Sequence, residues 1–352
     1  MPPQTLESVE TIIYMGYTEA KANEIWKAWL EVEASQAGGN EFQWGFLEYV
    51  LPIEKRAEND NDAGEGLEED DWDGMMKWLG VADELRSKIM DPEFVNVRLT
   101  ESARFWVHDT MELRFLMLEE RMEKEARGER GHSNQEHATT TPPATSSPQP
   151  PCPAPPSGFT ELWKSKSAYR IHRDSNQKIP LVCLSSKTPS DFRGHMGTHL
   201  YLFAQKEVAL NHQQYLRKRV PGSPTIMIRM LIPNRYIEIH LRPLVMEFGD
   251  LWKEVVHTSR RGINFSGRGK LGYIRKEWLI IGPVSRSRSS RGIGRLGHWG
   301  EVSEGNVAWV DVEWEEEEEG FRRQRQVQAR QYVFQGDDTI DDLSENAFWQ
   351  EV

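Results

Sequence analysis

The sequence of 352 residues predicts an α+β protein, in which an all-α N-terminal domain is followed by a linker and by an α+β C-terminal domain with a small mixed or antiparallel sheet. Apolar residues recur at helical spacing through much of residues 1–128. Short β-branched runs bounded by Pro or Gly follow residue 158. A Pro/Thr/Ser-rich segment separates the two patterns, and the strands and helices after it show no regular βαβ repeat, which favours α+β.

The N-terminal domain is predicted to span residues 1–128 and to be acidic. Helical spacing indicates two helices in residues 5–31, broken at Gly16, with Thr18 capping the second helix. A third helix contains Phe42 and Phe46 and ends near residue 52. One or two more helices cover residues 72–90, and a long amphipathic helix capped by Thr100 completes the domain.

Residues 129–157 are rich in Pro, Thr and Ser and contain almost no large apolar side chains. Such a segment cannot bury enough surface to offset chain entropy, so it is predicted to be a disordered linker. The basic α+β domain then covers residues 158–335. The acidic tail, residues 336–352, is predicted to be disordered.

Within the basic domain the runs rich in β-branched residues and bounded by Pro or Gly predict strands, and two helices are expected among them. The strands are expected at residues 161–164, 181–184, 200–203, 225–231, 277–284 and 307–314, and the helices at residues 206–219 and in part of 244–256.

Charge is distributed unevenly along the chain. Residues 1–157 carry 14 Lys and Arg against 31 Asp and Glu, residues 158–310 carry 25 against 11, and residues 311–352 carry 4 against 13. A basic block therefore lies between two acidic blocks. Either the acidic parts dock on the basic domain within the molecule, or the basic domain binds nucleic acid or another polyanion.

Several classes of site are not expected. Cys152 and Cys183 are the only cysteines, which disfavours a disulfide framework and a multi-Cys zinc site. His195 and His199 are four residues apart, but glycines interrupt any helix between them, so no metal site is predicted. The acidic stretch 57–71 has Ala63 where a calcium loop needs a ligand, which favours a solvated loop.

No signal sequence or membrane span is predicted, so the expected location is the cytoplasm or nucleus, without a membrane partner. The Gly- and base-rich stretch 262–272 lacks the spacing of a phosphate loop. The run SRSRSSRGIGR, residues 285–295, is interpreted as a solvated loop, with a nucleic-acid-binding arm or a phosphorylation target as alternatives.

Four stretches resemble a family of uncharacterised fungal proteins with the same layout of helical domain, linker and α+β domain. They are DPEFVNVRLTESARFWVHDTMELRF, HLYLFAQKEVALNHQQYLRKRVPGS, and LWKEVVHTSRRG with EWLIIGPVSR downstream. The resemblance covers most of both domains. It implies an architecture and no particular activity.

The C-terminal half also resembles, more faintly, a diverged ADP-ribosyltransferase fold. ELWKSKS resembles the first strand that grips NAD, with Lys164 in place of Arg, and GTHLYLF resembles the Gly-x-x-x-Tyr turn, with Tyr201 as the tyrosine. WKEVV offers Glu254 as the catalytic carboxylate, although Trp252 replaces the usual Glu or Gln. The resemblance implies that NAD is bound by Lys164 and Tyr201 and that Glu254 stabilises the cationic transition state. Lys cannot reproduce the bidentate grip of Arg.

The N-terminus resembles the first two helices of a ubiquitin-associated domain. Met15, Gly16 and Tyr17 match the loop that binds ubiquitin in that family, although the third helix arrives late. The resemblance implies that Met15 and Tyr17 are exposed.

The favoured hypothesis is therefore a non-enzymatic or catalytically diverged protein that acts through a protein partner, with no cofactor unless the transferase resemblance holds. The transferase hypothesis predicts an open pocket lined by Lys164, Tyr201 and Glu254. The nucleic-acid hypothesis predicts that seven basic residues share one face. They are Arg217, Lys218, Arg219, Arg260, Arg261, Arg268 and Lys270.

Overall fold

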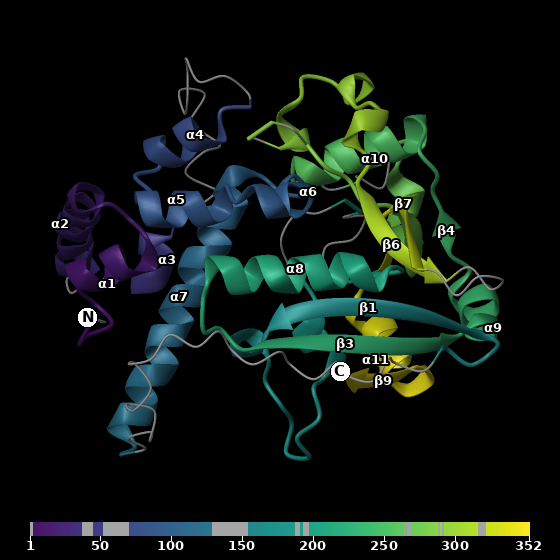
Figure 1. Cartoon of the computed structure of the whole chain (residues 1–352), viewed down its shortest axis with the longest axis horizontal. Helices are drawn as coiled ribbons and strands as arrows, with labels where there is room; N and C mark the ends of the chain where they lie inside the picture. The colour runs from purple at the N-terminus through teal and green to yellow at the C-terminus, as the bar shows by residue number, and fades with distance from the viewer. Residues whose placement is uncertain are drawn as a thin grey trace.

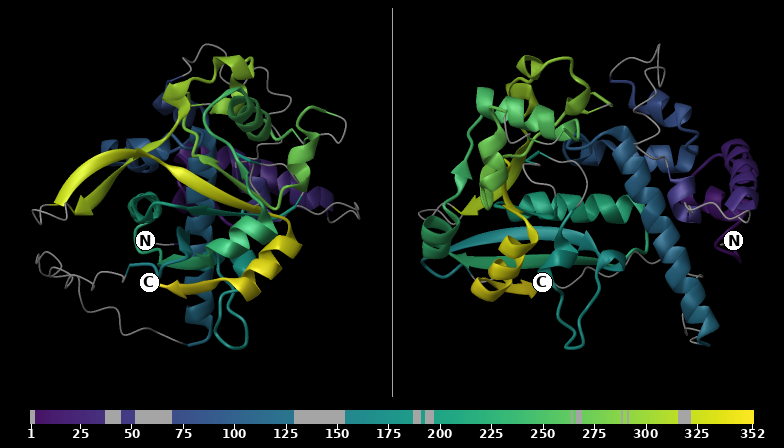
Figure 2. Two further views of the ribbon diagram at one scale, coloured as in Figure 1. Left: turned by 90° about the vertical axis from the view of Figure 1, so that its right-hand side faces the viewer. Right: turned by 180° about the vertical axis from the view of Figure 1, so that it is seen from behind.

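The computed structural model describes residues 3–36, 45–51, 70–128, 154–186, 191–192, 197–263, 265, 269–287, 289–290, 292–315 and 322–352. Its N-terminal part is helical and its C-terminal part combines a mixed sheet with helices, which confirms the α+β prediction. The N-terminal helices lie to one side of the molecule, and the sheet with its covering helices lies to the other (Figures 1 and 2). None of the helices in the described ranges is both long and apolar enough to span a bilayer.

The N-terminal part begins with the two helices that the sequence predicts on either side of Gly16. Its elements are α1 Val9–Met15, α2 Glu19–Gln36, α3 Phe46–Val50, α4 Trp72–Trp78, α5 Asp83–Ile89, the 3₁₀ turn η2 Pro92–Phe94, α6 Val95–Arg98 and α7 Ala103–Ala126. Thr18 caps α2 as predicted, since its hydroxyl accepts from the Lys21 amide at 3.3 Å. Phe42 lies outside the described residues.

The cap predicted for the long helix is wrong by two residues. Ser102 caps α7, with its hydroxyl accepting from the Phe105 amide at 3.2 Å. The Thr100 hydroxyl instead donates to the Val97 carbonyl and satisfies the end of α6. A 3₁₀ turn and a short helix precede α7, so the chain needs the extra residues to change direction before the helix starts.

The described residues form one mixed sheet with strand order β4-β5-β8-β2-β1-β3-β9 and a separate hairpin. The sheet strands are β1 Phe159–Ser167, β2 His199–Phe203, β3 Thr225–Pro233, β4 Leu244–Val245, β5 Leu279–Pro283, β8 Arg330–Gln335 and β9 Phe348–Glu351. The hairpin pairs β6 Trp309–Glu315 with β7 Arg322–Gln328. Only β4 and β5 run parallel within this set of strands.

Helices cover both faces of the sheet. The helix α8, Lys206–Arg219, lies along β1 and β3 (Figure 1), and α10, Asp250–Arg260, packs with Tyr201 and Ile280 on the same side. The helix α11, Asp337–Asn346, packs with η4 against residues of the opposite face. The remaining turns are η3 Ala168–Arg170, η4 Leu181–Leu184, α9 Asn234–Tyr236, the π-helix η5 Ile237–Leu241, η6 Gly272–Lys276, η7 Ile293–Arg295, η8 Trp299–Glu301 and η9 Glu304–Asn306.

Two predictions about the C-terminal part are wrong. Residues 181–184 form the 3₁₀ helix η4 and not a strand, because Leu181 and Leu184, three residues apart, both enter the core. Residues after 336 form α11 and β9 where disorder was expected. Ile340 and Leu343 are buried, and β9 pairs with β3, so this acidic segment contributes enough apolar contact to fold.

The two parts share a core. Tyr215 of α8 packs among the N-terminal apolar residues, and its hydroxyl donates to the Ile89 carbonyl at 2.9 Å. Further along, the Ala103 amide donates to the Ser290 carbonyl at 2.9 Å. Backbone and side-chain contacts therefore both connect the helical part to the sheet part.

Candidate functional site

Two of the three predicted transferase residues lie together. The Lys164 amine on β1 donates to the backbone carbonyl of Tyr201 on β2 at 2.9 Å. The Tyr201 ring is turned to the opposite face of the sheet, where it packs with Trp252 and Val255 of α10. Lys164 therefore contacts the backbone of Tyr201, and the side chain of Tyr201 belongs to a different core.

Glu254 lies on α10, and its carboxylate is bound to the Lys270 amine at 2.8 Å. That pair is at the surface, because Lys270 is largely exposed. None of the contacts described here joins Glu254 to Lys164 or to the Tyr201 ring, as the predicted pocket would require. The Lys164 amine bonds to the Tyr201 carbonyl, the Glu254 carboxylate pairs with Lys270, and the Tyr201 ring packs in the core.

The two lysines of β1 occupy the place where β1 and β2 diverge. The strands pair at Trp163 and Phe203, but at His199 β2 pairs with Ser186. The Lys166 amine reaches into this region and donates to the carbonyls of Cys183 and Ser185. The amines are thus bound by carbonyl dipoles and not by carboxylates.

Burial lowers the pKa of Lys164 to about 7, and the nearby Lys166 lowers it further. Burial lowers the pKa of Lys166 to about 8, with Arg170 adding to the effect. His212 of α8 stacks on Phe203 at 5.3 Å. Burial, and after it the charge of Lys164, lowers the pKa of His212 to about 4, so its imidazole is neutral at pH 7.

Carboxylates from α7 meet guanidinium groups from the C-terminal part beside these lysines. Asp109 accepts from Arg170 at 2.7 Å and from Arg219 at 2.8 Å, and Glu112 also binds Arg170. The Arg219 guanidinium stacks over Trp106 at 4.6 Å. Burial opposes ionisation of Asp109, but the two arginines hold its pKa at about 2.

A second ionic network connects the same two parts near α10. Arg260 donates to Asp191 at 2.8 Å, to the Thr100 carbonyl at 2.9 Å, and to the carboxylate of Glu101. Asp191 also accepts from the Ser285 amide at 2.7 Å. Burial would lower the pKa of Arg260, but Asp191 and Glu101 together raise it above its usual value.

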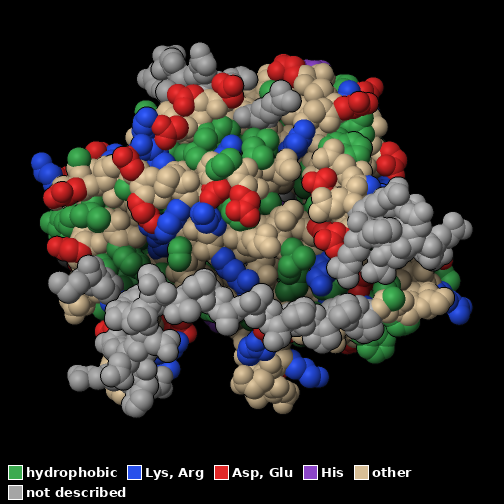
Figure 3. Space-filling model, viewed as in Figure 1, with side chains coloured by type: hydrophobic (Ala, Val, Ile, Leu, Met, Phe, Trp, Pro, Cys, Tyr) green, Lys and Arg blue, Asp and Glu red, His purple; other side chains and the backbone are tan. Residues whose placement is uncertain are grey.

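These pairs bear on the nucleic-acid hypothesis, because several of the basic residues that it requires are neutralised. Lys218 pairs with Asp91, Arg219 with Asp109, and Arg260 with Glu101, so the acidic partners come from the N-terminal part. Lys and Arg are interspersed with Asp and Glu on the face shown in Figure 3. Arg268 lies outside the described residues.

The ubiquitin hypothesis required Met15 and Tyr17 to be exposed, and both are buried. The Tyr17 hydroxyl donates to the Val50 carbonyl at 2.8 Å. Gly16 has φ +129°, and a Cβ there would lie 2.4 Å from Leu85 Cδ2. This loop therefore needs glycine to end α1 and to admit Leu85, which is a structural role.

Two further predictions concern metals. No group of His, Cys, Asp and Glu in the described ranges is arranged to hold an ion. Most of the acidic stretch 57–71, and His195, lie outside those ranges.

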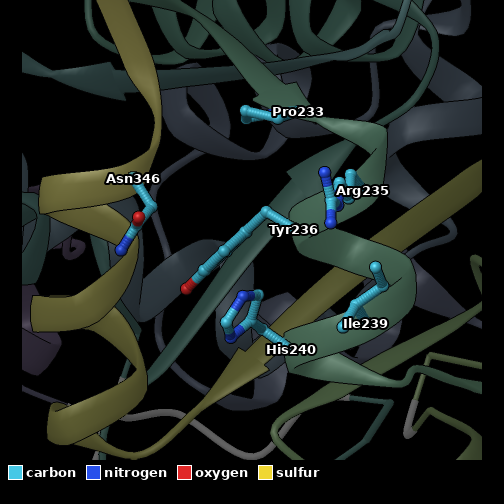
Figure 4. A pocket seen from close by; sticks show the side chains of 6 residues that line it. All are labelled: Pro233, Arg235, Tyr236, Ile239, His240 and Asn346. Carbon is cyan, nitrogen blue, oxygen red and sulfur yellow. The ribbon is translucent and has the colours of Figure 1, made fainter.

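A surface pocket of about 320 Å³ opens between α9, η5 and α11. Its lining residues are Pro233, Arg235, Tyr236, Ile239, His240 and Asn346. Figure 4 shows the Tyr236 hydroxyl pointing toward the helix that carries Asn346. That hydroxyl donates to Asp342, and the ring stacks on His240 at 5.6 Å. None of the predicted transferase residues lines this pocket.

Sequence reasoning missed Asp109 and the pocket residues. Asp109 had a detectable signal, because an acidic residue within the apolar stripe of a long helix needs a buried cationic partner. The pocket residues gave no such signal. Tyr236 and His240 are four residues apart and lie in a segment for which no element was predicted.

Comparisons of this chain with protein-family models, with curated proteins and with solved structures find no match. The functional proposal therefore depends on the geometry above.

Proposed function

We propose that this chain acts by binding a protein partner through the face formed by α9, η5 and α11, and that it does not transfer ADP-ribose. The observation that carries the proposal is the pocket beside Ile239, a side chain that is 49% exposed. A hollow lined by aromatic side chains, with an exposed aliphatic side chain and a few polar groups, offers apolar area that a partner could bury.

The backbone at this face also supports the proposal. Residues 237–241 form a π-helix, and Arg242 after it has φ +45°, which is unusual for a residue other than glycine. π-Helical turns interrupt regular hydrogen bonding and recur at functional sites. This irregular turn holds Ile239 and His240 at the pocket.

ADP-ribosyl transfer is the second candidate, and the contact between Lys164 and Tyr201 favours it. The pairing of Glu254 with Lys270, the turn of the Tyr201 ring into the α10 core and the carbonyl partners of the β1 lysines oppose it. A transferase needs a fixed carboxylate next to the ribose that develops positive charge.

The test uses the full chain in two measurements. A photo-crosslinking residue at Ile239 should form a discrete adduct with a partner in the cells that express the protein, whereas the same residue at Leu30, which is 45% exposed on α2, should not. Titration with NAD should give no saturable heat. Saturable NAD binding with transfer that Glu254→Gln abolishes would overturn the proposal.

A further inference from the structure

The strand β9 forms one edge of the sheet. It follows β3 at the end of the strand order, with Leu231 opposite Phe348 and Arg229 opposite Gln350. The Val352 amide donates to the Met227 carbonyl. Hydrogen-bonded and non-hydrogen-bonded positions alternate in an antiparallel pair, so Phe348 and Gln350 bond to β3.

The same alternation directs the N–H and C=O groups of Trp349 and Glu351 away from β3. They form a short row of donors and acceptors on the free side of the strand. Such an edge is a template for pairing with another strand, and proteins use it to bind extended peptides.

The side chains around this edge are apolar and charged, and the carboxylate of Glu351 accepts from the Arg173 guanidinium at 2.7 Å. Phe348 is 67% exposed and contacts Phe159, with ring centroids 6.1 Å apart. Asn346, which lines the pocket of Figure 4, precedes Phe348 by two residues. Phe348 shares its face of the sheet with Leu231 and Phe159, which is the face that α8 covers, whereas α11 and Tyr236 pack on the opposite face.

Residues 336–352 contain six Asp and Glu and no Lys or Arg. Asp337, Asp338, Asp341 and Glu345 are exposed on α11, directly before the strand. An added strand must approach this negative surface, so positive charge on it is favoured. Two copies of this chain paired at β9 would bring like charges together, which disfavours self-association.

We infer that the free edge of β9 receives a strand from a basic partner protein, which pairs with Trp349 and Glu351 and places an apolar side chain against Phe348. The inference rests on the proposed function, because α11, which forms part of the proposed binding face, leads directly into β9. Main-chain hydrogen bonds supply affinity, and the negative charge of α11 favours a partner strand that carries positive charge.

The test is fluorescence anisotropy of the full chain with a labelled peptide of alternating Lys and Val, beside a matched peptide of alternating Glu and Val. Glu351→Pro removes the outward N–H without removing a bond to β3, since Glu351 is at a non-hydrogen-bonded position. We expect Glu351→Pro to weaken binding of the basic peptide about tenfold or more. Glu351→Ala, which loses the same carboxylate but keeps the N–H, should weaken it about threefold or less.

Equal binding by the wild type and Glu351→Pro would overturn the inference, because attraction to the acidic helix alone would then account for affinity. Equal binding of the Glu/Val peptide, or no binding of the Lys/Val peptide, would also overturn it. A dimer in sedimentation that Glu351→Pro dissociates would assign the edge to a second copy. If the peptide fails but the Ile239 crosslink persists, the proposed function stands without the strand inference.

Discussion

Asp109 is the residue on which the junction between the two parts depends most. Its carboxylate binds Arg170 and Arg219, and Arg219 is only 2% exposed. Neither guanidinium can lose its proton to escape burial. Removing the carboxylate would therefore leave buried positive charge without its counter-ion.

We expect Asp109→Ala to lower the free energy of unfolding by roughly 3–5 kcal/mol, the cost of breaking a buried ion pair. Urea denaturation measures the change. Glu345→Ala is the matched control, because it removes one carboxylate from an exposed position on another helix. Equal effects of the two substitutions would show that the buried network contributes nothing specific.

Lys164 should make the free energy of unfolding depend on pH. Its pKa is about 7 in the folded chain, and an unfolded lysine titrates near its ordinary value, 10.5. Between these values the unfolded state binds a proton that the folded state does not. The free energy of unfolding therefore rises with pH in this window.

We expect wild-type protein to gain about 2 kcal/mol more stability than Lys164→Met between pH 7 and pH 9. Urea denaturation at several pH values measures both slopes. Lys27→Met is the control, because Lys27 is exposed on α2. Parallel curves for the wild type and Lys164→Met would contradict burial of the Lys164 amine.

At the scale of elements, composition misled the prediction for the acidic C-terminal segment. Its many carboxylates indicated disorder, yet Ile340 and Leu343 lie on one side of α11 and enter the core. A few apolar residues at helical spacing are enough for this segment to fold, whatever its average composition, because the sheet provides a surface on which they pack. By contrast, α8 was predicted with its observed bounds, and its buried residues Val208, Ala209 and Tyr215 lie on one side of the helix.

We expect Leu343→Ala to destabilise the chain by roughly 2–5 kcal/mol, because the Leu343 side chain is 0% exposed and its removal leaves a cavity. Leu30→Ala, at an exposed helical position, should change stability by about 0.5 kcal/mol or less. Thermal or urea unfolding distinguishes the two. A Leu343→Ala variant as stable as Leu30→Ala would indicate that α11 does not pack on the sheet.

At the scale of the whole molecule, the two parts are connected by shared packing as well as by charge. Tyr215 of α8 lies in the N-terminal core, and the Asp109 and Glu101 networks cross the same junction. An interface that combines an apolar core with buried ion pairs should couple the stability of its two sides.

We expect α7 and β8 to open with the same free energy in native-state hydrogen exchange. Glu101→Gln, which removes the charge that binds Arg260, should lower both values together. Glu345→Gln serves as the control and should lower neither. Exchange of α7 at a clearly lower free energy than β8 would mean that the parts unfold independently.

The sequence by itself determined the class of the long helices and of the β-branched strands. Helical spacing identified α1, α2 and α7, and β-branched runs identified the strands around β3 and β5. These signals are local, because a helix or strand repeats its own apolar period within a few residues. The α+β class follows from their order along the chain.

Only the tertiary structure decided which charges are buried and which edges are free. Asp109 and Arg219 are 110 residues apart in sequence, and Lys164 is desolvated by segments that no local pattern connects to it. Whether β9 joins the sheet depends on β3, which precedes it by more than 100 residues. Pairing energies of this kind belong to contacts between distant segments, so they arise only when the chain has folded.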